Sequence, residues 1–332
     1  MTIPKVILDT DFNTMGDDGQ VLVMLARAMR RGQLELLGVT TVTGNEWVEQ
    51  ETAEALRAVE RLGLGGRVPV HAGAVFPLLR DEAGIEAELA ATPGIYTGAW
   101  RKPRPDPGDI LPPPDGFAAI EAASAHAVDF LVDAIRAHPG EVTVLAIGPL
   151  TNLALACRKA PDIALKLQRI VYMGGAVDVP GNITATAEFN WWFDPEAARI
   201  VLRQPVPHVV VPLDLTNKAR FGKDVFDAVA TGDPVVGPLF AATYGATFAA
   251  DPAATAEIWD TLAAAAILEP GLVTASRDVW LDLVAVSGPD YGRSVAFASD
   301  PPPGARRATL LLDVDLDRFW RFYVEALTDP FG

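Results

Sequence analysis

Four carboxylates, those of Asp9, Asp11, Asp17 and Asp18, lie directly after the apolar residues 6–8 (Val-Ile-Leu). Acidic side chains gathered at the end of a buried strand repel one another unless a cation lies among them. No His or Cys lies nearby, so every ligand would be an oxygen, which favours Ca²⁺ first and Mg²⁺ second. The alternative is a solvated acidic loop in a chain of net charge −16. Because the acids follow a strand and do not line a helix face, the pattern favours the metal.

The composition is that of a globular protein: 332 residues, 50% hydrophobic and 21% charged. No apolar run approaches the ~20 residues of a membrane span, and because residues 1–5 lead straight into a predicted strand we expect no signal peptide. The excess of 43 acidic over 27 basic residues argues against nucleic-acid polymers and anionic membranes as partners, and leaves a small molecule. A single cysteine, Cys157, rules out an internal disulfide and indicates the cytoplasm.

Short apolar strands alternate with amphipathic helices along the chain. This alternation predicts one α/β domain over residues 1–332, with an open, mostly parallel mixed sheet and helices on both faces. Residues 73–119, rich in Pro, Gly and acids, break the rhythm and indicate a long loop or lid. The predicted strands are 5–8, 34–42, 68–72, 142–147, 169–173, 208–212 and 308–315. The predicted helices are 20–31, 46–62, 124–138, 152–159, 195–202, 261–268 and 316–327.

Short polar residues follow five of the predicted strands. In parallel sheets ligands bind beyond the carboxyl ends of the strands, so we expect one shared site at that edge. Thr151 and Asn152 could instead serve only to cap a helix. The polar stretches are residues 9–18, 43–45, 148–152, 174–175 and 214–217.

Several common catalytic motifs are absent from the sequence, namely the Walker A loop, the Gly-x-Ser-x-Gly elbow and the His-Glu-x-x-His zinc helix. The glycines at 63, 65 and 66 follow a predicted helix and precede a strand, which indicates a helix stop and not a dinucleotide fingerprint. The four histidines are not spaced as metal ligands, so catalysis by a histidine acid is not indicated.

Five motifs occur in a fixed order: Leu-Asp-Thr-Asp at 8–11 with Asp17 and Asp18, Thr-Thr-Val-Thr-Gly-Asn at 40–45, Gly-Pro-Leu-Thr-Asn at 148–152, Met-Gly-Gly at 173–175, and residues 181–198. The last contains Gly-Asn at 181–182, Ala-Glu-Phe-Asn at 187–190 and Asp-Pro-Glu-Ala-Ala at 194–198. Together they resemble the nucleoside hydrolases, which include inosine-uridine-preferring and purine-specific enzymes. The resemblance extends from about residue 5 to 268 and is weaker beyond.

The resemblance implies a calcium-dependent hydrolase that splits ribonucleosides into base and ribose, in a homodimer or homotetramer. It implies that Asp11 is the general base. The implied metal ligands are Asp11, Asp18, the main-chain carbonyl of Ile147, and Asp260. Asp9 would hold these ligands in place without binding the ion itself. The implied ribose ligands are Asp17, Asn45 and Asn190 for the 2′- and 3′-hydroxyls, and Asn182 and Glu188 for the 5′-hydroxyl.

Two departures from the family pattern bear on the substrate. The loop between Asp11 and Asp17 is two residues longer than usual, with Met15 where some relatives carry an additional Asp. Pyrimidine-accepting members have a His before the late Asp, whereas this chain has Trp259, as purine-specific members do. We therefore expect purine nucleosides such as inosine, adenosine or guanosine, stacked on Trp259, with Trp100 as the candidate second stacking partner.

Two other functions fit the same residues. A non-catalytic ribose or nucleoside binder would keep the pocket and lose turnover, and a hydrolase of another N-riboside would keep the chemistry and change the leaving group. Sugar release from a panel of nucleosides distinguishes the three.

Overall fold

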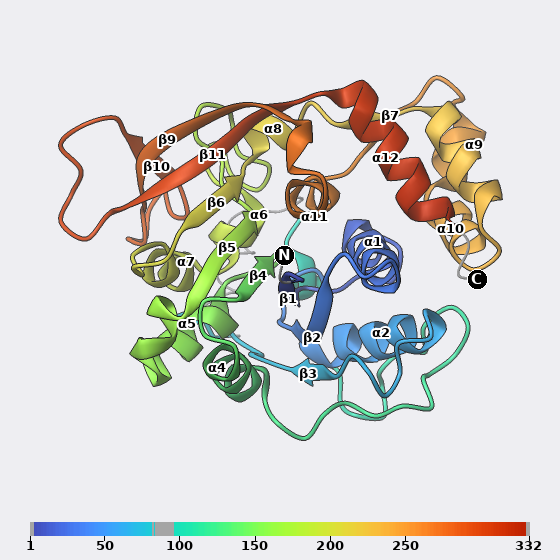
Figure 1. Ribbon diagram of the computed structural model, residues 1–332, viewed down its shortest axis with the longest axis horizontal. Helices are drawn as coiled ribbons and strands as arrows, with labels where there is room; N and C mark the ends of the chain where they lie inside the picture. Colours follow the sequence, from blue (N-terminus) through green and yellow to red (C-terminus); the bar gives the residue numbers. More distant parts are fainter. Residues whose placement is uncertain (1–2, 82, 84–95, 330–332) are drawn as a thin grey trace.

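The computed structural model describes residues 3–81, 83 and 96–329, and its centre is a nine-stranded sheet of order β10-β9-β11-β6-β5-β4-β1-β2-β3 (Figure 1). All neighbours from β11 to β3 are parallel, while β9 is antiparallel to both β10 and β11. The strands are β1 (Lys5–Thr10), β2 (Glu35–Thr41), β3 (Val70–Ala72), β4 (Val142–Ala146), β5 (Leu167–Met173), β6 (His208–Val211), β9 (Val273–Leu283), β10 (Ser294–Phe297) and β11 (Arg306–Val314); β7 (Arg220–Phe221) and β8 (Ala256–Glu257) form a separate pair.

Helices cover both faces of this sheet (Figure 1). One apolar core includes side chains of α1, α2, α11 and α12, and a second, on the other face, includes those of α4, α5 and α7. The helices are α1 (Asp17–Arg30), α2 (Val48–Arg61), α4 (Ala127–Ala137), α5 (Thr151–Lys159), α6 (Phe189–Phe193), α7 (Pro195–Leu202), α8 (Leu213–Thr216), α9 (Lys223–Gly232), α10 (Val236–Ala250), α11 (Asp260–Leu268) and α12 (Leu316–Thr328), with the 3₁₀ turns η1 (Gly98–Arg101), η2 (Pro161–Leu165) and η3 (Pro270–Leu272).

The predicted fold class is confirmed. β1 lies between β2 and β4, and its residues 6–8 are fully buried because both faces of the strand are covered. The predicted stop after α2 is also present, where Gly63 follows the last turn with a φ of +66° that favours glycine. The sequence missed the β9–β10 hairpin and the helices α9 and α10.

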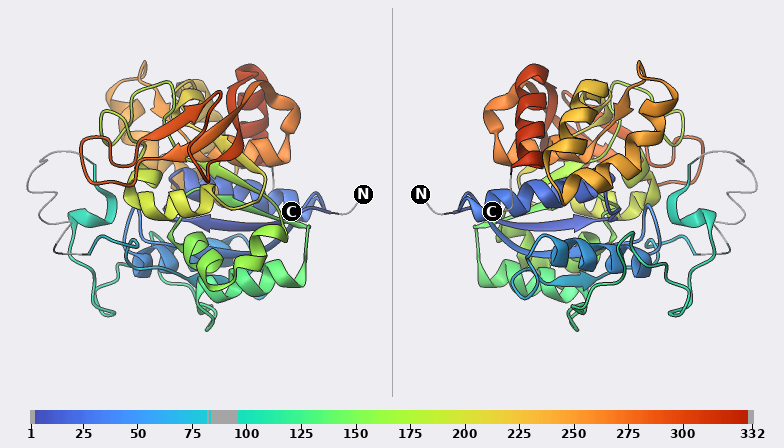
Figure 2. Two further views of the ribbon diagram at one scale, coloured as in Figure 1. Left: turned by 90° about the vertical axis from the view of Figure 1, so that its left-hand side faces the viewer. Right: turned by 90° about the vertical axis from the view of Figure 1, so that its right-hand side faces the viewer.

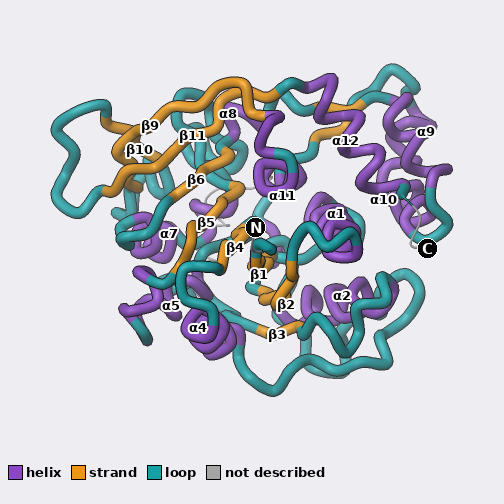
Figure 3. The backbone as a smooth tube through the Cα atoms, in the orientation of Figure 1, coloured by secondary structure: helices purple, strands orange, loops and turns teal. Residues whose placement is uncertain are grey.

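The predicted loop 73–119 is described except for residues 82 and 84–95. Figure 3 shows its later part as a loop beside α2. Arg57 and Arg61 of α2 pair with Asp115 of the loop, and Glu60 accepts the N–H of Ala119 at 2.9 Å. This part of the loop is therefore fastened along a helix. In both views of Figure 2, η1 lies at the end of the molecule opposite the N-terminus.

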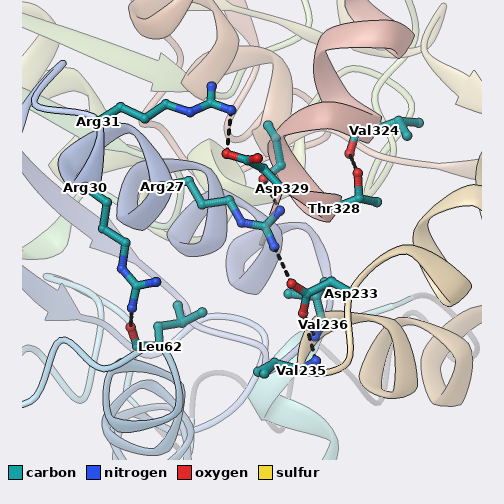
Figure 4. Close-up of polar contacts among 11 residues, drawn as sticks. Arg27, Arg30, Arg31, Leu62, Asp233, Val235, Val236, Val324, Thr328 and Asp329 are labelled. Atoms are coloured by element: carbon teal, nitrogen blue, oxygen red, sulfur yellow. Dashed lines mark hydrogen bonds and ion pairs between the residues drawn. The ribbon is translucent and has the colours of Figure 1, made fainter. Parts of the chain in front are cut away.

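A buried ion pair connects α1 to the α9–α10 junction (Figure 4). Arg27 donates to the Asp233 carboxylate at 2.9 Å and to the carbonyl of Ala326 in α12 at 2.6 Å. The second oxygen of Asp233 accepts the N–H groups of Val235 and Val236, both at 2.8 Å. Asp233 thus caps α10 and neutralises a guanidinium that is almost fully buried, so the α9–α10 junction and α12 are joined to the last turn of α1.

Candidate active site

A cavity of about 440 Å³ opens at the carboxyl ends of the strands. Of the five predicted polar stretches, residues 9–18 and 43–45 line the cavity. At the ends of β4 and β5 the lining residues are Ile147 and Met173, which precede the predicted stretches 148–152 and 174–175, and residues 214–217 after β6 do not line it. Asp214 instead accepts the N–H groups of Val177 and Asp178. The lining residues from the strand ends are Asp11, Asn13, Gly16, Asp17, Asn45, Ile147 and Met173.

Three carboxylates from distant parts of the chain meet beside this cavity. One oxygen from each of Asp17, Asp18 and Asp260 lies within 4.8 Å of the other two. The sequence placed Asp17 and Asp18 before a helix, but they are the first residues of α1, and Asp260 is the first residue of α11. A helix N-terminus stabilises nearby negative charge, which helps both helices to hold acids here.

Asp17 joins the two helices directly. Its carboxylate accepts the N–H groups of Trp259 and Asp260 at 2.9 and 3.2 Å, so it caps α11 from α1. This contact draws Asp17 into the cluster of three. The family resemblance had implied Asp11, and not Asp17, as the carboxylate that binds the metal together with Asp18 and Asp260.

The carboxylate of Asp11 lies next to this cluster and is held by contacts of its own. Its carboxylate accepts the backbone N–H of Asn45 at 3.0 Å. A Cβ added at Gly44 would lie 2.3 Å from one of its oxygens, and a Cβ at Gly148 would lie 2.7 Å from the other. The two glycines of the predicted motifs therefore make room for this carboxylate.

Among the residues that the structure describes, no basic side chain that lines the cavity balances the negative charge of these aspartates. Burial, and then the charges of neighbouring aspartates, raise the pKa values of Asp11, Asp18 and Asp260 well above the usual range. No Lys or Arg in the described part of the chain lines the cavity. A hard cation with oxygen ligands would supply the missing charge, so the donor set fits Ca²⁺ or Mg²⁺.

Side chains behind the cavity hold two of the acids. The hydroxyl of Thr10 donates to Asp18 at 2.5 Å. Asp9 does not line the cavity, is fully buried, and accepts from Thr40 at 2.5 Å and from Asn152 at 2.9 Å. Burial raises the pKa of Asp9 to about 6. Asn152 is thus a structural link between strand ends.

The connection between β5 and α7 supplies the opposite wall. The amide of Asn190 donates to the carbonyls of Ile147 at 2.9 Å and Met173 at 3.3 Å. Glu188 accepts the N–H groups of Gly175, Asn190 and Trp191, and burial raises its pKa to about 7. The side chain of Asn182 accepts the N–H of Phe189 at 2.9 Å. Asn182, Glu188 and Asn190 all line the cavity, as does Ile147.

Trp259 lines the cavity, but the expectation for Trp100 is wrong. Trp100 is buried outside the cavity, where its ring stacks on Phe193 with centroids 4.6 Å apart and meets Trp47 edge-on. The turn η1 directs it into an apolar cluster. Met15 likewise lies in the core and not in the cavity, so the longer loop presents Asn13 and Gly16.

Two tyrosines that the sequence did not single out line the cavity as well, Tyr96 and Tyr244. Tyr96 precedes η1 and donates its hydroxyl hydrogen to the side-chain oxygen of Asn45 at 2.9 Å. Tyr244 lies on α10 and accepts from Gln20 at 3.1 Å. No sequence pattern marked either tyrosine, since Tyr96 belongs to a loop and α10 itself was not predicted.

Comparison with known proteins agrees with this site. Residues 6–321 match the family of inosine-uridine preferring nucleoside hydrolases. The pyrimidine-specific ribonucleoside hydrolase RihB of Escherichia coli is 30% identical over 328 residues, which is 97% of this chain and 96% of RihB.

Two solved structures resemble the whole chain. A purine-preferring ribonucleoside hydrolase from Gardnerella vaginalis is 26% identical, with a TM-score of 0.74 over 98% of both chains. A plant nucleoside hydrolase, PpNRh1, is 24% identical, with a TM-score of 0.82 over 99% of this chain and 100% of its own, and shows the shared fold. The match over residues 6–321 and the identity with RihB settle the assignment: this chain is a member of the nucleoside hydrolase family.

Proposed function

We propose that the chain, acting as one domain, hydrolyses the N-glycosidic bond of ribonucleosides with Ca²⁺ bound, and that purine nucleosides are its preferred substrates. The observation that carries the proposal is the meeting of Asp17, Asp18 and Asp260 beside Asp11 at a cavity that amides, aromatic rings, two glutamates and a few apolar side chains also line. Acidic groups in that number, without a basic side chain, suit a cation and a polyhydroxyl sugar together.

Asp11, Asp18 and Asp260, with the carbonyl of Ile147, would hold the ion. When bound, it would orient ribose hydroxyls and a water and lower the pKa of that water, weakly in the case of Ca²⁺. The weak effect of calcium makes a carboxylate base necessary, and Asp11 accepts the proton of the attacking water in this proposal. Its raised pKa in the absence of a cation would fall once a positive charge lies beside it.

The remaining polar side chains hold the sugar. Asp17, Asn45 and Asn190 are assigned to the 2′- and 3′-hydroxyls, and Asn182 and Glu188 to the 5′-hydroxyl. As the bond to the base lengthens, positive charge develops on the ribose ring. The carboxylates and amide oxygens around it are fixed by backbone contacts and stabilise that charge without rearranging.

The purine preference rests on Trp259, which precedes Asp260 and lines the cavity. None of the four histidines, all of which are described, lines it. Tyr96, Tyr244 and Phe189 add further aromatic surface for a base. Because the relatives include both a pyrimidine-specific and a purine-preferring enzyme, we infer the purine preference from Trp259 and not from membership of the family.

The remaining expectations concern the setting of the enzyme. None of the helices in the described part of the chain has the length and apolarity needed to cross a membrane. The one cysteine, Cys157, is buried and unpaired, which supports a reducing compartment such as the cytoplasm. We propose that the active form is a homodimer or homotetramer. Light scattering of the purified protein measures the number of subunits.

A reducing-sugar assay on inosine, adenosine, guanosine, uridine and cytidine tests the function. We expect sugar release from the purine nucleosides at the highest kcat/KM. The Asp11→Ala variant should release none while remaining folded. A protein whose melting temperature rises with nucleoside but which releases no sugar would be a binder, and faster turnover of uridine would contradict the purine preference.

A further inference from the structure

The segment 96–101 is fastened to the turn that carries Asn45. The N–H of Ala99 donates to the carbonyl of Gly44 at 2.8 Å. Gly98 has a φ of +56°, and a Cβ there would lie 2.1 Å from the carbonyl oxygen of Gly44. Only glycine permits so close an approach of the two backbones. The segment is therefore fixed to the residue immediately before Asn45.

Tyr96 extends from this fixed segment and lines the cavity. Its ring lies 5.3 Å from that of Phe189, and the guanidinium carbon of Arg101 lies 4.3 Å from its centroid. The side chain is 43% exposed, and its hydroxyl donates to the side-chain oxygen of Asn45 at 2.9 Å. Two neighbours thus hold the ring while its hydroxyl reaches a residue assigned to the ribose.

Asn45 is bound at both ends of its carboxamide. Its amide nitrogen donates to the main-chain carbonyl of Asp11 at 3.0 Å and lies 3.4 Å from a carboxylate oxygen of Asp18. The hydroxyl of Tyr96 donates to the carboxamide oxygen. The terminal torsion of Asn has a broad profile, so an oxygen without a donor would let the carboxamide rotate. A hydroxyl donor at the oxygen keeps the amide nitrogen directed at the acids.

We propose that Tyr96 is a positioning residue, which acts through the carboxamide of Asn45 to set how the cavity receives ribose. This inference rests on the proposed function, because it takes Asn45 to be a ribose ligand. Tyr96 does not act as an acid or base in it.

This role differs from stacking on the base. A stacking ring would serve some bases better than others, and replacing Tyr by Phe would cost little because the ring remains. A hydroxyl that positions Asn45, a residue assigned to ribose, should affect the kcat/KM of every riboside equally. Loss of that hydroxyl should have no further effect on kcat/KM once Asn45 is replaced.

A double-mutant cycle tests the inference with Tyr96→Phe, Asn45→Ala and the combined variant. Tyr96→Phe should lower kcat/KM about fivefold, as expected for one lost hydrogen bond, and by the same factor for inosine and uridine. The affinity for free ribose, measured by calorimetry, should fall by a similar factor. In the Asn45→Ala background the same change should have no further effect on either quantity.

Tyr291→Phe is the matched control. Its hydroxyl donates to Glu196 at 2.7 Å outside the cavity, so removal of that hydroxyl should leave kcat/KM and ribose affinity unchanged. An effect of Tyr96→Phe that adds to that of Asn45→Ala, or that differs between inosine and uridine, would overturn the inference. If the wild-type protein releases no ribose, the proposed function fails, and the ribose affinities of the four proteins still decide the role of Tyr96.

Discussion

The carboxylate of Asp17 accepts the backbone N–H of Asp260, 243 residues further along the chain, at 3.2 Å. Through this bond the first turn of α1 caps the first turn of α11, and the acids of the two helices are held together before any ion binds. The like charges cost stability, and the cap offsets part of that cost. The bond therefore couples the position of the metal ligands to the fold.

Asp17→Asn separates the charge of this residue from its capping role. The Asn side-chain oxygen still accepts both N–H groups, so the melting temperature without metal should be unchanged or higher. With one carboxylate fewer at the site, the affinity for Ca²⁺ and kcat/KM should each fall roughly 10- to 100-fold. Calorimetric titration of Ca²⁺ and sugar-release kinetics measure the two. Asp227→Asn, an exposed residue of α9, should change neither, and an unaltered Asp17→Asn enzyme would remove Asp17 from the site.

Trp259→Ala should affect the base more than the sugar. Since the ring lines the cavity next to Asp260, its loss should lower kcat/KM for inosine at least about tenfold, a magnitude in keeping with an aromatic contact. The affinity for free ribose should change less than about twofold. Equal losses in both measurements would show that Trp259 serves packing alone.

Asp233→Ala should be among the most destabilising single changes outside the site. It leaves the buried guanidinium of Arg27 without this partner and removes the cap of α10 (Figure 4). Breaking such a pair costs about 3–5 kcal/mol of unfolding free energy, which urea denaturation measures. The exposed pair of Arg31 with Asp329 is the control, and Asp329→Ala should cost less than about 1 kcal/mol. Equal costs would contradict the buried pair's importance.

His208 should make the protein less stable in mild acid. Burial lowers its pKa to about 4, and its ring is held between the hydroxyl of Tyr172 at 2.8 Å and the carbonyl of Gln204 at 3.1 Å. The unfolded chain binds the proton at pH about 6.5 and the folded chain only near 4, so stability is lost as pH falls through that window, by up to about 3 kcal/mol.

Buried carboxyls with raised pKa values act in the opposite direction, so the difference between two proteins is the informative quantity. His208→Gln removes this titration, and the advantage of the wild type over the variant should shrink steadily between pH 6.5 and 4 in urea denaturation. Parallel stability curves for the two proteins would show that His208 does not contribute.

The parallel part of the sheet and its helices could be predicted because buried strands are continuous apolar runs separated by turn residues. The β9–β10 hairpin could not, since the first half of β9 (Val273–Leu283) is mostly exposed and polar and includes the charged residues Arg277 and Asp278. α10 has apolar residues on all its sides and lacks the helical period that prediction needs.

The residues of the site likewise divide into those that could be predicted from the sequence and those that could not. Acids and amides at strand ends were found because parallel strands bring those ends together. Tyr96 and Tyr244 come from a loop and from an unpredicted helix, so no local pattern marked them. Trp100 was misplaced because sequence spacing does not tell which way a side chain leaves a 3₁₀ turn. The direct link between Asp17 and Asp260 depends on tertiary packing of α1 against α11.

Ribose release from inosine by protein stripped with a chelator, and then supplied with Ca²⁺, tests the central claim most directly. That claim is that Asp18 and Asp260 hold a cation beside Asp11 where a riboside is cleaved. Turnover should disappear with the metal and return with it in the wild type, and should not return in Asp260→Asn at the same Ca²⁺ concentration. Undiminished turnover by the metal-free protein would contradict the account.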